Sequence, residues 1–222
     1  MTRMDRKITT VVFDLDGTLL DTLQDLADSV NYALRTHGLP ERTTAEVRQM
    51  LGNGIRYLME HAVPAGMVPE AFEPVFDTFR TYYVDHCLDK TQPYDGILPM
   101  LDCLRRRGLR MAIVSNKLDA AVQELNERFF ARYVDSAVGE SETVRRKPNP
   151  DGVLEAIRRL GSTPDEAVYV GDSEVDFATA RNAGVPCITV LWGFRDEDFL
   201  RSVGATTFAH RPADVVDLIC GC

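Results

Sequence analysis

Four short runs of apolar residues, rich in β-branched side chains, constrain the fold of this chain most strongly. They are residues Ile8–Phe13, Leu109–Val114, Ala167–Val170 and Cys187–Leu191. Runs that are apolar at nearly every position are typical of strands buried on both faces of a parallel sheet. Segments of helical periodicity separate them, so the sequence predicts an α/β fold with a doubly wound parallel sheet.

Helices are expected between these runs. Three apolar stripes with helical spacing contain, in turn, Ile97, Met100, Leu101 and Leu104; Ala121, Val122, Leu125 and Phe129; and Val153, Leu154, Ile157 and Leu160. Gly108 and Gly161 follow the first and third stripes, where a residue in the left-handed conformation commonly ends a helix.

The stretch from residue 19 to residue 93 interrupts the alternation of strands and helices. It has helical periodicity and no convincing strand. Long crossover helices of the core are the alternative, but the stretch exceeds an ordinary strand–helix–strand connection. We therefore predict a core formed by residues 1–18 and 94–222, with a small α-helical domain, residues 19–93, inserted after the first strand.

Composition restricts the partners of the protein. The net charge is −9 and the isoelectric point is about 5.0, which disfavours binding to nucleic acid or to an anionic membrane. No apolar run approaches the length of a membrane span. The five cysteines lack metal-ligand spacing, and Cys220 and Cys222 are interpreted as part of an exposed tail. We expect a cytoplasmic protein, monomeric or homodimeric, that acts on a small molecule.

Polar clusters follow three of the predicted strands, and a fourth precedes a predicted helix. They are Asp14-Leu15-Asp16-Gly17-Thr18, Ser115-Asn116-Lys117, Gly171-Asp172-Ser173-Glu174-Val175-Asp176 and Lys147-Pro148. Ligands of parallel α/β sheets bind beyond the carboxyl ends of the strands, so we expect these clusters to meet in one crevice.

The residue types in this crevice indicate phosphate chemistry. Asp14, Asp16, Asp172 and Asp176 bring up to four carboxylates together, which is tolerable when a hard cation or shared protons offset the repulsion. Oxygen ligands suggest Mg²⁺, although Mn²⁺ or Co²⁺ also suits such a site. A cation, a lysine and the hydroxyl of Ser115 together fit a phosphoryl group.

The four clusters, in this order and in these strand contexts, resemble the signature motifs of the haloacid dehalogenase superfamily. The similarity spans nearly the whole chain and is greatest to the phosphoglycolate phosphatase-like branch, which inserts a helical cap after the first motif. The resemblance implies a Rossmann-like core and a magnesium-dependent phosphatase. Because Asp16 is present, it favours phosphomonoesters over the dehalogenase and phosphonatase reactions.

The resemblance also implies roles for individual residues. Asp14 is the nucleophile that forms an aspartyl-phosphate, and Asp16 is the general acid and base. Mg²⁺ is held by Asp14, the backbone carbonyl of Asp16 and Asp172, while Asp176 supports the site from outside this ligand set. Ser115 and Lys147 hold the phosphate.

Substrate contacts are expected from Gly17 and Asn116 in the core. The cap segment Gly52-Asn53-Gly54, with Arg56, resembles the part of phosphoglycolate phosphatases that approaches the active site. Arg56 either pairs with a substrate carboxylate or is an exposed helical arginine, and Lys117 is interpreted as a surface charge.

The favoured substrate is 2-phosphoglycolate. Three alternatives stay open: a phosphosugar mutase, a 5'-nucleotidase or pyrophosphatase of the same superfamily, and a non-catalytic module that binds phosphorylated ligands or proteins. The last is disfavoured because every signature residue is present.

Overall fold

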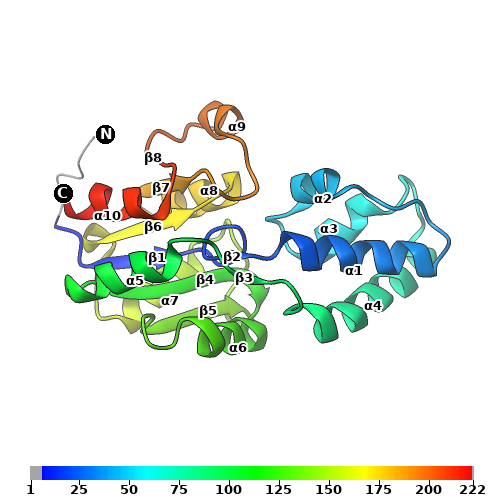
Figure 1. Cartoon of the computed structure of the whole chain (residues 1–222), viewed down its shortest axis with the longest axis horizontal. Coiled ribbons are helices and arrows are strands. Elements are labelled where there is room, and N and C mark those ends of the chain that lie inside the picture. The colour runs from blue at the N-terminus through cyan, green and yellow to red at the C-terminus, as the bar shows by residue number, and fades with distance from the viewer. Residues whose placement is uncertain (1–6, 222) are drawn as a thin grey trace. The chain divides into compact units, whose positions relative to one another are not determined.

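The computed structural model describes residues 7–221, and these form two compact units (Figure 1). One unit is Leu20–Gln92, which we call the helical unit. The rest, described over residues 7–19 and 93–221, is called the core unit.

A six-stranded sheet forms the centre of the core unit. Its strands lie in the order β5-β4-β1-β6-β7-β8, and neighbouring strands are parallel. The bounds are β1 Thr10–Phe13, β4 Arg110–Leu118, β5 Ser136–Glu140, β6 Ala167–Gly171, β7 Cys187–Val190 and β8 Phe208–Ala209. The predicted α/β fold with a doubly wound parallel sheet is confirmed.

Two strands of this sheet were not predicted. β5 has the sequence SAVGE, and β8 is only two residues long. Both lie at the edges of the sheet, where a strand needs fewer apolar residues than a central strand covered on both faces. Neither therefore has the long apolar run that identified the other four.

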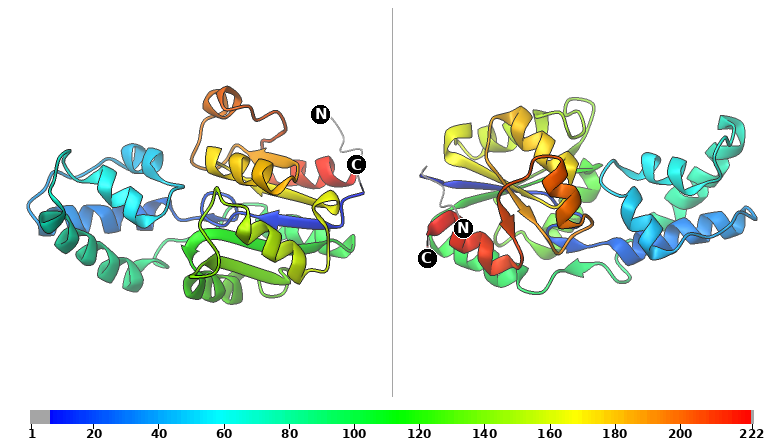
Figure 2. Two further views of the ribbon diagram at one scale, coloured as in Figure 1. Left: turned by 180° about the vertical axis from the view of Figure 1, so that it is seen from behind. Right: turned by 90° about the horizontal axis from the view of Figure 1, so that it is seen from above.

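Helices cover both faces of the sheet. α5 and α10 pack together on one face, and α7 and α8 pack together on the other (Figure 2). The helices are α5 Ile97–Arg106, α6 Asp119–Phe129, α7 Asp151–Arg159, α8 Glu174–Ala183, α9 Glu197–Ser202 and α10 Pro212–Cys220, with a 3₁₀ turn at Pro164–Glu166. Gly108 and Gly161 have φ values of 81° and 60°, as predicted for residues that end helices.

Strand β1 is the point at which the order of the strands in the sheet changes direction. The strand that follows it, β4, lies on one side, and β6 lies on the other. Phe13 is in register with Ile113 and with Val170, so all three strands reach the same edge of the sheet together. Ligands of open α/β sheets bind at such a reversal, which makes the residues after Phe13 the place to look for a site.

The helical unit contains α1 Leu23–Thr36, α2 Thr44–Met50, α3 Ile55–Ala62 and α4 Pro69–His86. Where it begins and ends, β2 Leu20–Asp21 pairs with β3 Gln92–Pro93 in a two-stranded sheet. Helix α4 supplies much of the apolar core through Phe72, Phe76, Phe79 and Tyr83, which are all buried. Their spacing places them on one face of the helix.

The search for membrane-spanning segments covered the residues that the structure describes. None of the helices there has the length and apolar character needed to cross a bilayer.

Candidate active site

Asp14 follows β1 directly and is 5% exposed. Its backbone N–H donates to the carbonyl of Val170 at 2.9 Å, which continues the pairing of β1 with β6 by one residue. The chain then turns at Gly17, where φ is +87°. A Cβ atom at Gly17 would lie 2.6 Å from Asp172 Oδ2 and 2.7 Å from the Phe194 ring, so only glycine fits this turn.

Lys147 is the buried cation of the site and is 6% exposed. Its Nζ donates to Asp14 Oδ1 at 2.5 Å, to Asp176 Oδ1 at 2.7 Å and to the Tyr169 hydroxyl at 3.2 Å. The backbone N–H of Lys147 donates to Asn116 Oδ1 at 2.6 Å, and Asn116 Nδ2 donates to the Lys147 carbonyl at 3.3 Å. Asn116 thus holds the backbone of Lys147, and its predicted substrate contact stays a prediction.

Asp176 occupies the first turn of α8 and is 1% exposed. Its Oδ2 accepts from the backbone N–H of Ser173 at 3.1 Å and from the Ser173 hydroxyl at 2.6 Å, in a capping box. Its Oδ1 accepts from Tyr169 Oη at 3.0 Å as well as from Lys147. Four donors therefore occupy the two oxygens of this carboxylate.

Asp172 has fewer donors around it. Oδ2 accepts from the backbone N–H of Phe194 at 2.6 Å, and Oδ1 is at the 3.5 Å limit of a hydrogen bond from Thr18 Oγ1. The loop after β7 approaches Asp172 so closely that a Cβ atom at Gly193 would clash with Asp172 Oδ2. Asp172 is 1% exposed and retains more acceptor capacity than Asp176.

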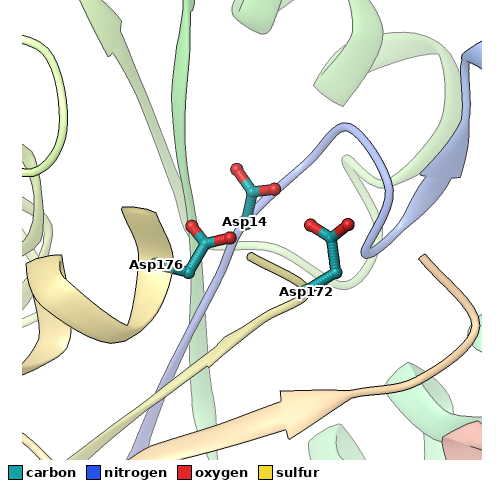
Figure 3. A group of neighbouring side chains, drawn as sticks. All are labelled: Asp14, Asp172 and Asp176. Carbon is teal, nitrogen blue, oxygen red and sulfur yellow. The ribbon is translucent and has the colours of Figure 1, made fainter. Parts of the chain in front are cut away.

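Three carboxylates converge at the end of the sheet (Figure 3). Asp14, Asp172 and Asp176 can each offer one oxygen such that these atoms all lie within 4.8 Å of one another. All three are buried, and one lysine ammonium lies among them. Oxygen donors at this spacing fit a hard divalent cation.

The pKa values in this cluster reflect a shortage of positive charge. Burial, and then the charge of Asp176, raise the pKa of Asp14 well above its usual range against the opposing effect of Lys147. The same two causes raise the pKa of Asp172 to about 7. Burial alone would raise the pKa of Asp176, but the charge of Lys147 and hydrogen bonds from Lys147, Ser173 and Tyr169 together lower it. A bound cation would relieve this repulsion.

Asp16 lies at a more open position, with 22% of its side chain exposed. The Ser115 hydroxyl donates to Asp16 Oδ2 at 3.4 Å, and Lys117 Nζ lies 3.3 Å from Asp16 Oδ1. The structure therefore brings together the predicted core residues, namely Asp14, Asp16, Gly17, Ser115, Asn116, Lys147, Asp172 and Asp176.

The predicted cap residues all belong to the helical unit. Gly52-Asn53-Gly54 connects α2 to α3, and Gly54, with φ at 84°, precedes the first residue of α3. Arg56 lies in the first turn of α3, and its two terminal nitrogens donate to the carboxylate of Glu73 at 3.0 and 2.9 Å. Its guanidinium also lies over the Phe76 ring, 4.7 Å from the centroid. The contact of Gly52, Asn53, Gly54 and Arg56 with a substrate stays a prediction.

Sequence reasoning assigned no role to two residues of the site, Tyr169 and Ser173, although Ser173 belongs to one of the predicted polar clusters. Tyr169 stands within the apolar run of β6, where nothing marks its hydroxyl as a partner of Lys147 and Asp176. Ser173 did carry a signal, because Ser-x-x-Asp is the pattern of a capping box at the start of a helix.

Comparison with known proteins places this geometry in a family. The family model for haloacid dehalogenase-like hydrolases matches residues 11–190. A phosphoglycolate phosphatase of Aquifex aeolicus is 32% identical over 210 residues, which cover 94% of this chain and 95% of the relative. An N-acetylmuramic acid 6-phosphate phosphatase of Pseudomonas aeruginosa is 31% identical over 216 residues, covering 96% and 95%.

A solved structure agrees with these sequence relatives. A crystal structure of a protein from Lactobacillus delbrueckii subsp. bulgaricus superposes with a TM-score of 0.91 at 35% identity, covering 96% of this chain and 98% of that one. The names of the curated relatives agree with the predicted class of phosphoric monoester hydrolases. The family model, the relatives and the clustered motifs together show that the chain belongs to the haloacid dehalogenase-like hydrolases.

Proposed function

We propose that this protein is a Mg²⁺-dependent phosphatase that hydrolyses a small phosphomonoester, with 2-phosphoglycolate as the favoured substrate. The observation that carries the proposal is the buried contact of Asp14 with Lys147, 2.5 Å long, beside two further carboxylates at the carboxyl edge of the sheet. The name of the Aquifex aeolicus relative supports the substrate.

The reaction has two steps. An oxygen of Asp14 attacks phosphorus, the bond between phosphorus and the ester oxygen breaks, and the leaving oxygen takes a proton from Asp16. Asp16 then accepts a proton from a water molecule as that water attacks the phosphorylated Asp14. The second attack releases inorganic phosphate and restores the Asp14 carboxylate.

Asp14, Asp172 and the backbone carbonyl of Asp16 are the proposed ligands of Mg²⁺. The two carboxylates differ from Asp176, whose oxygens already accept from four donors, so Asp176 supports Lys147 and the ligands rather than binding the ion directly. When bound, Mg²⁺ neutralises carboxylate charge and polarises the phosphoryl oxygens.

Lys147 and Ser115 are proposed to hold the phosphoryl group. Lys147 already touches the nucleophile, and Ser115 touches the acid that serves the leaving oxygen. Burial lowers the pKa of Lys147, but the charges of Asp14 and Asp176 and the hydrogen bonds to them raise it by more. The ammonium therefore stays charged throughout the neutral range. Fixed donors of this kind stabilise charge that develops on the equatorial oxygens.

We further propose that residues 19–93 act as a cap that selects the substrate, through Gly52, Asn53, Gly54 and Arg56. The roles proposed for Asp14, Asp16, Ser115 and Lys147 concern the phosphoryl group and the metal, so we assign recognition of the rest of the substrate mainly to this unit. A sugar phosphate is the second candidate substrate class, because the relative from Pseudomonas aeruginosa is named for one.

Phosphate release tests the proposal. We expect release from 2-phosphoglycolate with Mg²⁺ and none with EDTA, and we expect Asp14→Asn to lower the rate about a thousandfold or more. A panel of sugar phosphates and nucleoside monophosphates ranks the substrates. Formation of glucose 6-phosphate from β-glucose 1-phosphate would instead identify a mutase, and release that survives Asp14→Asn would refute the mechanism.

A further inference from the structure

Residues 192–195, which we call the β7 loop, follow β7 and lie against the turn that leads out of β1. At one end of the loop, Trp192 Nε1 donates to the carbonyl oxygen of Thr18 at 2.9 Å. The next residue is Gly193, where a Cβ atom would clash with the carbonyl oxygen of Gly17. The β7 loop is therefore packed directly onto the turn that follows the proposed nucleophile.

The other end of the β7 loop is attached to the segment that follows β6. The backbone N–H of Phe194 donates to Asp172 Oδ2 at 2.6 Å. Arg195 then donates from Nε and from one terminal nitrogen to the two carboxylate oxygens of Glu174, at 2.7 and 3.0 Å. Glu174 lies in the first turn of α8, two residues after Asp172. Two parallel hydrogen bonds of this kind fix the orientation of both partners.

The two oxygens of Asp172 have different surroundings. Oδ2 accepts from Phe194 and is enclosed by backbone, since a Cβ atom at Gly17 would lie 2.6 Å from it and one at Gly193 would clash with it. Oδ1 is at the 3.5 Å limit of a hydrogen bond from Thr18 Oγ1. The loop thus occupies one oxygen of the carboxylate, and Oδ1 is the one with capacity to bind a cation.

We propose that the β7 loop positions Asp172 for metal binding, with Oδ1 directed to the cation, and that the pair of Arg195 with Glu174 holds the loop in place. Arg195 is therefore a positioning residue that acts through the loop. Only 11% of its side chain and 28% of that of Glu174 are exposed, so water replaces this pair poorly. The inference rests on the proposed function and concerns the metal that this function needs.

The charge of Arg195 by itself would have the opposite effect on metal binding. Burial and then the charge of Asp176 raise the pKa of Asp172, and the positive charge of Arg195 is among the effects that oppose this rise. Arg195 is thus close enough for its charge to act at Asp172, where it would repel a bound cation. Removing the charge alone should strengthen metal binding, whereas releasing the β7 loop should weaken it. One variant therefore separates the two explanations by sign.

Binding of Mn²⁺ in the absence of substrate tests the inference, with electron paramagnetic resonance reporting the free ion. We expect Arg195→Met to raise the Kd for Mn²⁺ about 10-fold, and Arg195→Lys to restore part of the affinity. Trp192→Phe keeps a ring and changes no charge, but it removes the donor to Thr18, so it should raise the Kd about threefold. Arg201→Met is the matched control, because it removes the partner of Glu197 in α9, and it should leave the Kd unchanged.

Phosphate release from 2-phosphoglycolate gives a second readout. We expect Arg195→Met to raise the Mg²⁺ concentration for half-maximal release about 10-fold, while KM for the substrate at saturating Mg²⁺ changes less than about threefold. Circular dichroism in EDTA measures the folded fraction of each variant. A smaller folded fraction alone would lower the rate in proportion and leave KM unchanged.

The outcomes separate this inference from the proposed function. Mn²⁺ binding by Arg195→Met that equals or exceeds that of the wild type would show that Arg195 contributes only charge and would overturn the inference. Loss of phosphate release at every Mg²⁺ concentration, with an unchanged Kd for Mn²⁺, would overturn it as well. Either result leaves the phosphatase standing, whereas a wild type that binds no Mn²⁺ and releases no phosphate would refute the proposed function itself.

Discussion

A lysine and an arginine form ion pairs of similar length in opposite surroundings in this molecule. In the core unit, Lys147 pairs with Asp14 and Asp176 at 2.5 and 2.7 Å, and at most 7% of any of these side chains is exposed. In the helical unit, Arg56 pairs with Glu73 at 2.9 Å, and nearly half of each side chain is exposed. Water can replace a lost partner of Arg56, but it cannot do so for Lys147.

The difference supports the roles proposed for the buried charges. Around Arg56, Glu60 and Glu73 together also carry an excess of negative charge, but solvent screens it. The buried cluster is unbalanced, because one ammonium faces Asp14, Asp172 and Asp176. A fold that tolerates such an imbalance in its interior has a use for it, and binding a cation and a phosphoryl group is the use that we propose.

The largest effect is expected from removing the buried ammonium. Lys147→Met leaves Asp14 and Asp176 buried without their partner, so it should lower the free energy of unfolding by about 3–5 kcal/mol and abolish phosphate release. Urea unfolding in EDTA measures the first effect free of metal. Arg56→Met is the control and should unfold at nearly the wild-type urea concentration. Equal midpoints for both variants would contradict the comparison.

Alanine substitutions at two glycines, one in each unit, distinguish the effect of backbone strain from the effect of crowding. Gly17 and Gly66 have φ values of +87° and +81°, so alanine strains both alike. At Gly66 a Cβ atom would meet nothing within 4 Å, whereas at Gly17 it would lie 2.6 Å from Asp172 Oδ2. Gly66→Ala should cost about 1–2 kcal/mol of stability and leave activity intact.

Gly17→Ala should cost about 2–5 kcal/mol, because it adds overpacking to the strain, and should lower kcat/KM at least about 100-fold by displacing Asp172. Unfolding curves and phosphate release on both variants make the comparison. If the two alanine variants lost stability and activity equally, the crowding at Asp172 would have no consequence.

Much of the core could be predicted because its signals are local. Apolar runs identified the four central strands, and the polar residues after them had to meet where parallel strands end. The hydroxyl of Tyr169 could not be predicted, since its role depends on Lys147 and Asp176 reaching it from other segments. The burial of Lys117 was missed for the same reason, because neighbouring sequence does not show what covers a side chain.

The partner of Arg56 is likewise invisible in the sequence. Glu73 stands on the next helix, and only the packing of α3 against α4 brings the two together. The loop Gly52-Asn53-Gly54 was identified by its resemblance to a family segment. That resemblance gives the position of the loop, but it does not identify the residues that its neighbours contact. Long-range pairs of this kind need the fold before they can be assigned.

The smallest effect is expected at Glu155, whose ion pairs lie at the surface of the core unit. Hydrogen bonds from Arg158 and then Arg159 lower the pKa of Glu155 to about 2, against 4.5 for an ordinary glutamate. A lowered pKa in the folded state stabilises the protein at pH values above 4.5, and that stabilisation is lost as the pH falls through about 2. Because 72% of the side chain of Arg158 and 43% of that of Arg159 are exposed, solvent and salt screen the effect.

Glu155→Gln should therefore lower Tm slightly at pH 6, and the difference from the wild type should shrink as the pH falls from 4.5 toward 2. Thermal melts across this range, at low and at high salt, measure the difference. Added salt should shrink it at pH 6, as expected for a pair in contact with water. If the Tm difference grew on acidification, its sign would be opposite to the one expected from the lowered pKa. Glu155 would then resemble the buried carboxylates beside Lys147 rather than an ion pair screened by solvent.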